Sequence, residues 1–207
     1  MKLIIISDTH GKHDSLGKLS GDVLIHCGDI GIGSRPTLDQ VLDLDAWFGT
    51  QDFQLKLCIG GNHDFALQSS ARHNPSLFKN AEYLEDRAVA FGDLLFYGAP
   101  WIPDLKDWAY YLDDTELRAR WAKIPSETDV LITHTPPSGF LDRNSSGRSC
   151  GCIALRERVM QVKPRLHCFG HIHASAGTAV DQGTIFVNAA VVDRTYKIAR
   201  PPIEIHL

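Results

Sequence analysis

The chain has 207 residues, the length of one ordinary domain, and 43% of them are hydrophobic while 22% are charged. This composition can fill a packed core and excludes an intrinsically disordered chain. The formal net charge is −4 at pH 7, so the chain lacks the excess of Lys and Arg with which proteins attract a nucleic acid. We therefore expect one globular domain, residues 1–207, and no long nucleic acid as substrate.

The first apolar run, residues 3–6, is too short for a signal peptide, and no later run approaches the roughly 18 apolar residues of a transmembrane helix. Cys27, Cys58 and Cys168 stand in or beside apolar runs, where they predict buried, reduced thiols. Cys150 and Cys152 enclose a single glycine, a spacing shorter than that of the usual zinc sites. The sequence thus predicts a cytoplasmic protein with no membrane partner.

Short apolar runs rich in β-branched residues, bounded by Gly, Pro, Asn or Asp, predict strands. In chain order they are residues 2–6, 23–26, 54–59, 94–97, 130–133, 166–169, 184–188 and 203–206. Helical spacing predicts helices over residues 37–48, with Thr37 as the N-cap, and over residues 115–123 and 152–162. The polar segment 142–149 is predicted to be a mobile loop, and such loops often border active sites. This alternation predicts a layered α/β domain with mixed sheets.

Acidic and histidine residues cluster directly after the predicted strands. The clusters are Asp8 and His10 after the first strand, Asp29 after the second, Asn62, His63 and Asp64 after the third, His134 after the fifth, and His171 and His173 after the sixth. In a layered α/β fold the carboxyl ends of the strands lie along one edge, where these side chains would converge.

Taken singly, each cluster has a structural explanation. Asp8 and Asp29 could stabilise turns, Asn62 could cap a helix, and a lone histidine at the end of a strand is usually structural. All the clusters would need such an explanation at once. We therefore interpret them as one dinuclear metal site.

The mixture of imidazole, carboxylate and amide side chains indicates divalent transition metals. Imidazole suits Mn, Fe and Zn, and oxygen ligands suit harder ions, so we predict two divalent ions, Mn or Fe, with Zn also compatible. Two ions about 3.5 to 4 Å apart need a shared ligand, and a carboxylate has two oxygens with which to bridge them. Such a pair can activate a water to hydroxide and hold a phosphoryl group, which suits in-line displacement at phosphorus.

In this order, the segments Asp8-Thr-His10, Gly28-Asp29, Gly61-Asn-His-Asp64, Thr133-His134 and Gly170-His-Ile-His173 resemble the calcineurin-like metallophosphoesterase superfamily. The resemblance implies a two-sheet β-sandwich flanked by helices, with the active site at the carboxyl ends of the strands. It implies a first metal held by Asp8, His10 and His173, a bridge at Asp29, and a second metal held by Asn62, His134 and His171. It also implies that His63 contacts the phosphate or protonates the leaving oxygen, with Asp64 orienting its ring.

The carboxy-terminal third resembles the MPPED subgroup of metallophosphoesterase-domain proteins, through residues 129–142, Cys150-Gly-Cys152, residues 162–173 and residues 201–205. This resemblance implies phosphodiesterase activity on small phosphodiesters such as cyclic nucleotides. A relative without the first histidine of Gly-His-Ile-His would lack a ligand of the second metal. Because His171 is present here, the resemblance favours an active enzyme.

Other functions fit the same residues. A phosphomonoesterase or a protein phosphatase could use the same centre, whereas the low basic charge weighs against a nuclease. A non-catalytic scaffold of the same fold would be expected to lack ligands, and here every ligand position is filled. Trp101, Arg143 and Arg148 are candidates for the rim of the substrate pocket, but Trp101 could equally be packing and both arginines could be solvated loop residues. The sequence leaves the oligomeric state open.

Overall fold

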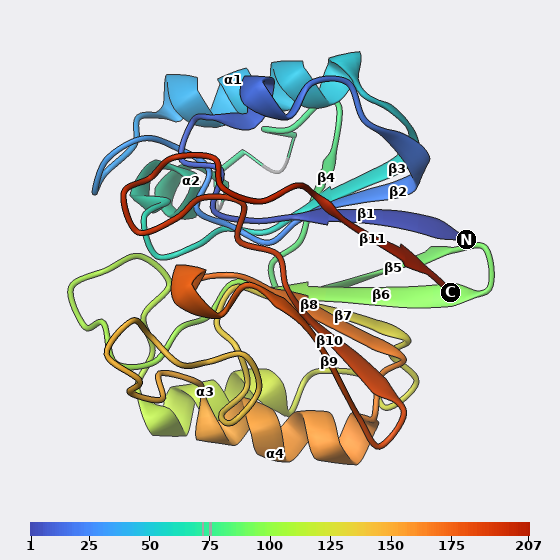
Figure 1. Cartoon of the computed structure of the whole chain (residues 1–207), viewed down its shortest axis with the longest axis vertical. Helices are drawn as coiled ribbons and strands as arrows, with labels where there is room; N and C mark the ends of the chain where they lie inside the picture. The colour runs from blue at the N-terminus through green and yellow to red at the C-terminus, as the bar shows by residue number, and fades with distance from the viewer. Residues whose placement is uncertain (72, 75) are drawn as a thin grey trace.

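Two β-sheets pack face to face between two layers of helices (Figure 1). The computed structural model describes residues 1–71, 73–74 and 76–207. The first sheet has the strand order β11-β1-β2-β3-β4, and the second has the order β5-β6-β7-β8-β10-β9. The strands of the first sheet are β1 (Lys2–Ile6), β2 (Ser20–His26), β3 (Asp52–Cys58), β4 (Glu82–Tyr83) and β11 (Ile203–His206). Those of the second sheet are β5 (Arg87–Phe91), β6 (Leu94–Ala99), β7 (Val130–Thr133), β8 (Leu166–Phe169), β9 (Gly177–Asp181) and β10 (Thr184–Asn188).

The inner strands of both sheets are parallel, and antiparallel strands lie at the edges. The strands β1 to β4 pair in parallel, as do β6, β7, β8 and β10, whereas β11, β5 and β9 pair antiparallel. A parallel bridge between Ser7 and Ala190 joins the two sheets just beyond β1 and β10. The carboxyl ends of the parallel strands therefore meet at one end of the sandwich. The chain termini lie together at the other end (Figure 1), where the Met1 amino group donates a hydrogen bond to the Leu207 carbonyl.

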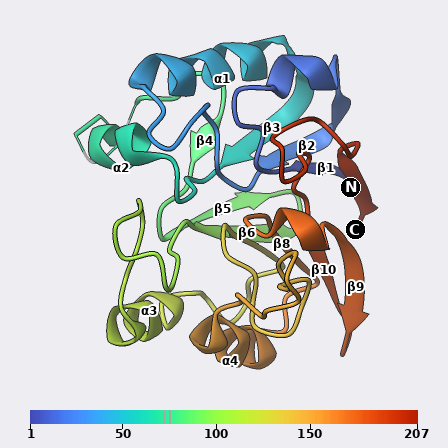
Figure 2. The same ribbon diagram turned by 60° about the vertical axis from the view of Figure 1, so that its left-hand side comes forward.

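The helices α1 (Leu38–Thr50) and α2 (Phe65–Ala71) lie beside the first sheet, and α3 (Asp114–Trp121) and α4 (Ile153–Val162) cover the second sheet (Figures 1 and 2). The helix α1 begins at the predicted cap, because the Thr37 amide donates to the Gln40 side chain and closes a capping box. Its residues Val41, Leu44 and Phe48 are fully buried. Two short 3-10 helices, η1 (His13–Leu16) and η2 (His173–Ser175), lie in the loops.

Apolar side chains fill the spaces between these layers. The space between the sheets holds residues such as Leu3, Ile25, Phe96 and Ile132, none of which has exposed surface. A second cluster, with Trp121, Leu155 and Phe186, packs α3 and α4 on their sheet, and a third, with Leu24, Val41 and Leu44, does the same for α1. Full burial of one such side chain contributes about 1.5–3 kcal/mol. This packing fixes where the strands end, and therefore where the loops at their carboxyl ends begin.

The predicted strands are all present, although some ends differ: β2 begins at Ser20 and β6 extends to Ala99. The strands β4, β5 and β9 and the helix α2 were not predicted. Segment 142–149, predicted to be a mobile loop, is a turn in which the Asn144 side chain accepts hydrogen bonds from the amides of Ser146 and Arg148. Cys27, Cys58 and Cys168 are buried free thiols, as predicted. Within the described ranges, no helix has both the length and the apolar character needed to cross a membrane.

His167 links the stability of this fold to pH. The Thr133 hydroxyl donates its proton to the Thr135 carbonyl. Its oxygen can therefore only accept from His167 Nε2, which lies 2.9 Å away and carries the proton of this hydrogen bond. Burial lowers the pKa of this fully buried imidazole from 6.5 to about 3. Between these two values the unfolded chain binds a proton that the folded chain excludes, so the free energy of unfolding decreases as the pH falls.

We expect His167 not to reduce the free energy of unfolding above pH 6.5. Below pH 6.5 we expect it to reduce the free energy of unfolding by about 1.4 kcal/mol per pH unit, which is the free energy that corresponds to one pKa unit. Urea unfolding of the unmodified chain and of His167→Gln between pH 6 and pH 4.5 measures this. The free energy of unfolding of the variant should depend less steeply on pH by that amount. Equal slopes would show that His167 is protonated in the folded protein as readily as in the unfolded one.

Candidate metal centre

Loops at the carboxyl ends of the parallel strands bring the predicted site residues to one place. The loop after β1 carries Asp8 and His10, the loop after β2 carries Asp29, the loop after β3 carries Asn62, His63 and Asp64, and the loops after β7 and β8 carry His134, His171 and His173. Three overlapping sets of these residues have ligand atoms within 4.8 Å of one another. They are Asp8, His10 and His173, then His10, Asp29 and His63, and then Asp8, Asp29 and His134.

The backbone of these loops is strained where it meets the site. The φ angles of Asp8, Asp29 and His171 are 55°, 58° and 67°, in the left-handed region that costs a residue with a side chain roughly 1–3 kcal/mol. Neighbouring glycines let the loops approach closely. A Cβ atom at Gly170 would lie 2.1 Å from Asp8 Oδ2, and one at Gly61 would lie 2.3 Å from Asp29 Oδ1. Glycine is therefore required beside these ligands because there is no space for a side chain.

Asp8, His10 and His173 form one side of the site. The Asp8 carboxylate lies 3.1 Å from His173 Nε2 and accepts the backbone amide of His171. His10 Nε2 is buried, and within the described part of the chain it has no hydrogen-bond partner. A buried polar atom without a partner is rare, and a metal ion at this point would satisfy it.

His134, Asn62 and His171 form the other side. His134 Nε2 lies 3.0 Å from Asn62 Oδ1 and 3.5 Å from Asp29 Oδ1. The ring centroids of His134 and His171 are 5.0 Å apart. The oxygens of Asn62 and Asp29 that face His134 can only accept hydrogen bonds or bind a cation. When His134 Nε2 carries no proton, it has the same capacity, so the three atoms are arranged as ligands of one metal ion.

Asp29 lies between the two sides. Its Oδ1 atom faces His134 Nε2 at 3.5 Å, and its Oδ2 atom faces His10 Nε2 at 3.7 Å. The two oxygens of one carboxylate thus point to histidines of different sides. This is the geometry that a bridging ligand needs.

The histidines are oriented by the backbone. The Nδ1 atoms of His134, His63, His173 and His10 lie 2.7, 2.8, 3.2 and 3.3 Å from the carbonyl oxygens of Cys27, Gly33, Asp193 and Gly31, respectively. A carbonyl accepts a proton from Nδ1, so in the neutral ring Nε2 carries the lone pair, and each Nε2 points into the site. Metal-binding histidines are commonly held in this way. The residues present therefore fit a pair of divalent ions.

The charges of the site also call for a cation. Burial acts to raise the pKa of Asp29, but the neighbouring His134 outweighs it and holds this pKa well below its usual range. Burial acts to lower the pKa of His134, but the charge of Asp29 and the hydrogen bond between His134 and Asp29 raise this pKa to about 9. Without a metal, a protonated His134 supplies the positive charge that the buried carboxylates require.

The side chain of His63 faces the site, whereas that of Asp64 contacts the backbone of the loops. The His63 ring is held by the Gly33 carbonyl, and its Nε2 atom lies 3.8 Å from Asp29 Oδ2. The prediction that Asp64 orients this ring is wrong. The Asp64 carboxylate is buried beneath the loops, where it accepts the backbone amides of Asp29, Ile30 and Gly61 at 2.8–3.0 Å. The short side chain of Asp64 reaches these amides more readily than it reaches the ring of His63. Asp64 is therefore a positioning residue that ties the loop after β2 to the loop after β3.

Burial and the charge of Asp29 raise the pKa of Asp64 to about 7, while the amide hydrogen bonds from Gly61 and Ile30 act in the opposite direction. Three amide donors require an acceptor with free lone pairs, which an ionised carboxylate offers fully. The structural role of Asp64 thus depends on its oxygens rather than on proton transfer.

The residues nominated for the pocket rim lie elsewhere. Trp101 is buried, and its Nε1 atom donates to Asp86 while Arg120 stacks on its ring. The Arg143 guanidinium binds the Gly147 carbonyl, and Arg148 stays on the surface of the same turn. Trp101 is therefore packing, and neither arginine lines a cavity at the metal centre. Cys150 and Cys152 belong to none of the candidate ligand groups found among the described residues.

Two cavities open beside the metal centre instead. The first, of about 620 Å³, is walled by Ile32, Trp108 and Tyr196 and reaches His10 and His63. We name it the aromatic cavity. The second, of about 290 Å³, lies over Asp29, Asn62 and the two histidines of the loop after β8, and it is lined by Asn144, Ser145 and Arg194. We name it the polar cavity. Trp108, Tyr196 and Arg194 could not be predicted as lining residues, because nothing in their local sequence distinguishes them from other loop residues.

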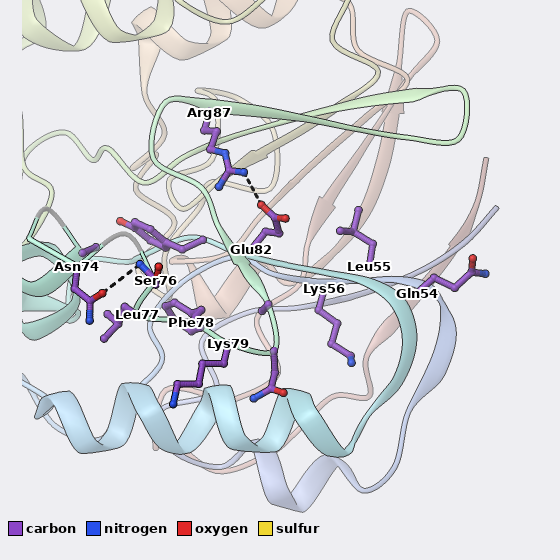
Figure 3. A pocket seen from close by; sticks show the side chains of 14 residues that line it. Gln54, Leu55, Lys56, Asn74, Ser76, Leu77, Phe78, Lys79, Glu82 and Arg87 are labelled. Atoms are coloured by element: carbon purple, nitrogen blue, oxygen red, sulfur yellow. Dashed lines mark hydrogen bonds and ion pairs between the residues drawn. The ribbon is translucent and has the colours of Figure 1, made fainter.

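A third cavity lies beside β4 and the middle of β3 (Figure 3). Its volume is about 430 Å³, and its lining includes Lys56, Lys79 and an ion pair of 2.6 Å between Arg87 and Glu82. Among the described residues of its lining there is no histidine or cysteine.

Known proteins share both the sequence and the fold. The family model for calcineurin-like phosphoesterases matches residues 1–175. The human Metallophosphoesterase domain-containing protein 1 is 34% identical over 232 aligned residues, which cover 100% of this chain and 71% of the human protein. A UPF0046 protein of Caenorhabditis elegans is 33% identical over 232 residues, with 98% of this chain and 79% of that protein covered. The crystal structure of Phosphopantetheinyl Hydrolase (PptH) from Mycobacterium tuberculosis has the same fold, with a TM-score of 0.63 at 15% identity over 94% of this chain and 90% of that one.

A sandwich of two mixed sheets with candidate ligands for two metals at its strand ends defines a metal-dependent phosphoric ester hydrolase. The chain belongs to the calcineurin-like phosphoesterase family. The resemblance to the metallophosphoesterase-domain proteins is confirmed by the human relative. The predicted two-sheet fold is confirmed as well.

Proposed function

We propose that this protein is a phosphodiesterase that hydrolyses small phosphodiesters, such as cyclic nucleotides, with two divalent metal ions. The observation that carries the proposal is that the aromatic and polar cavities meet at the metal centre, since His63 and Tyr196 line both of them. A phosphate at this junction has room for one ester group on each side. A phosphomonoester would fill only one of the two cavities.

The proposal includes the identity and the ligands of the ions. Asp8, His10 and His173 would hold the first ion and Asn62, His134 and His171 the second, with Asp29 shared between them. The mixture of imidazole and oxygen donors suits Mn or Fe, and Zn is compatible. When bound, such ions lower the pKa of a water toward neutrality and offset the charge that develops on the phosphoryl oxygens.

The other residues bind the substrate and move a proton. His63 presents Nε2 to the junction of the cavities while Gly33 holds its Nδ1 atom, so a protonated ring can bind a phosphoryl oxygen or give its Nε2 proton to the leaving oxygen. Asp64 keeps the loops that carry Asp29 and His63 in register through its amide contacts. We also propose that the protein acts in the cytoplasm, because its buried free thiols suit a reducing compartment.

Arg194 is the residue that we propose for a charged contact to the substrate. Its side chain lines the polar cavity and forms no hydrogen bond or ion pair with any residue that the structure describes. A free guanidinium close to a phosphate can form a bidentate contact. We expect Arg194→Ala to raise KM for a phosphodiester about 10-fold, which corresponds to about 1.4 kcal/mol, and to change kcat less. Arg148→Ala removes a surface arginine outside the cavity and serves as the matched control, and an equal rise in KM for both variants would remove the special role of Arg194.

The proposed function is tested by comparing the hydrolysis of bis-p-nitrophenyl phosphate with that of p-nitrophenyl phosphate, after chelation and readdition of Mn²⁺. We expect the diester to be cleaved faster, only with metal, and not by Asp8→Ala. Faster cleavage of the monoester would replace the proposal with a phosphatase. If two ions bind and neither ester is cleaved, a non-catalytic scaffold becomes the better explanation.

A further inference from the structure

The geometry of the aromatic cavity points to the chemical class of the substrate. We infer that this cavity binds a planar aromatic group that is esterified to the phosphate at the metal centre. The inference rests on the proposed function for the position of the phosphate. It concerns the residues Ile32, Trp108 and Tyr196, together with Lys12 and Lys197 at the rim.

The aromatic walls begin at the metal centre itself. The ring centroid of Trp108 lies 4.6 Å from that of His63, and the Tyr196 centroid lies 4.7 Å from that of His10 and 5.8 Å from that of His173. Each wall therefore packs edge-on against an imidazole of the site. A ring bound between these walls lies beside a phosphate at the metals.

Both walls are held in place by contacts to the predicted metal ligands. The Ala109 amide, next to Trp108, donates to the Asn62 carbonyl, and the Asp193 carbonyl accepts from His173 Nδ1. The Asp193 carboxylate in turn accepts the amides of Thr195 and Lys197 on both sides of Tyr196. The cavity is thus built before a ligand arrives, and a preformed site loses less entropy on binding.

The walls expose apolar surface that the fold does not use. Ile32 is 55% exposed and Tyr196 is 46% exposed, and both side chains face this one cavity. Paired apolar side chains around a concave site indicate a ligand whose surface they bury. The volume of about 620 Å³ lies in the range of small-molecule sites.

The rim adds a preference within that class. Lys12 and Lys197 border the cavity, and neither ammonium group forms an ion pair with a residue in the described part of the chain. Ammonium groups are hydrogen-bond donors without acceptor capacity. The rim therefore favours a ring with oxygen or nitrogen acceptors at its edge over a plain hydrocarbon ring.

The test compares two phosphonates that cannot be hydrolysed, p-nitrobenzylphosphonate and methylphosphonate, on the Mn²⁺-loaded protein by titration calorimetry. We expect the aromatic phosphonate to bind at least 10-fold more tightly. Trp108→Ala and Ile32→Ala should each reduce this ratio several-fold and leave the affinity for methylphosphonate the same. Ile153→Ala removes an isoleucine that is 63% exposed on another face and should not change the ratio.

Tryptophan fluorescence gives an independent readout. Trp47, Trp101 and Trp121 are at most 6% exposed, whereas Trp108 is half-buried in the cavity wall. A nitroaromatic ring in the cavity should therefore quench mainly the Trp108 emission, and Trp108→Phe should remove most of the quenching.

The outcomes separate this inference from the proposed function. Equal affinities for the two phosphonates, or binding of neither, overturn the aromatic site, whatever the hydrolysis assay shows. Aromatic preference that is lost in Trp108→Ala supports the site even if no phosphodiester is cleaved. Cleavage of the diester with no aromatic preference leaves the phosphodiesterase proposal standing alone.

Discussion

Asp29→Ala is expected to abolish metal-dependent hydrolysis and to reduce bound metal from two ions per chain toward none. The physical reason is that both oxygens of this carboxylate are used, Oδ1 toward His134 and Oδ2 toward His10. Removing it takes a ligand from both ions and leaves their mutual repulsion without the charge that offsets it. We expect kcat/KM for bis-p-nitrophenyl phosphate to fall by roughly 10³-fold or more, and metal analysis after gel filtration to show the loss directly.

The Asp29→Asn variant separates charge from packing. Asparagine keeps the oxygen that accepts the His63 amide but loses the negative charge, so metal binding should still fail while the fold remains intact by circular dichroism. Asp14→Ala removes an exposed carboxylate in η1 and is the control for a general loss of negative charge. A variant of Asp29 that is active and holds two ions would overturn the assignment of the bridge.

The sequence predicts the inner strands of the fold well because burial on both faces makes them continuous apolar runs. The segments of β1, β7 and β8 match their predicted ranges, and all their residues except Lys2 are buried. The edge strands β4, β5 and β9 were not predicted, whereas the edge strand β11 matches its predicted range. In β5 and β9, exposed positions interrupt the run, and β4 has only two residues. Their pairing depends on the neighbouring strand and on the sheet already formed, which local sequence does not contain.

The site divides in the same way. The ligand positions follow strands directly, so the strand order alone brings Asp8, Asp29 and His134 to one edge. The partners of Asp64 could not be predicted, because the amide of Ile30 is 34 residues away along the chain. The same holds for Trp108 and Tyr196, whose loops reach the metal centre only through tertiary contacts. The family resemblance implied that Asp64 orients the neighbouring ring, whereas in the structure its oxygens accept backbone amides.

His63→Ala is expected to retain both metals and to lose rate. The ring is held by the Gly33 carbonyl through Nδ1, and its Nε2 atom stands 3.8 Å from Asp29 Oδ2 at the junction of the two cavities. A positioned proton donor contributes roughly 10²–10⁴-fold to a rate. We expect a loss of this size in kcat for a diester whose leaving group is an alkoxide, measured together with metal content.

The leaving group distinguishes a proton donor from a ligand. A p-nitrophenolate ion is stable without a proton, so His63→Ala should lose much less rate on bis-p-nitrophenyl phosphate than on an alkyl diester. His73→Ala, which removes an exposed histidine bound to the Ser69 carbonyl, should change neither rate. Because His63 also lies within 4.8 Å of ligand atoms of His10 and Asp29, the opposite result has a clear meaning. Equal losses on both substrates, together with loss of metal as large as for Asp29→Ala, would make His63 a metal ligand instead of an acid.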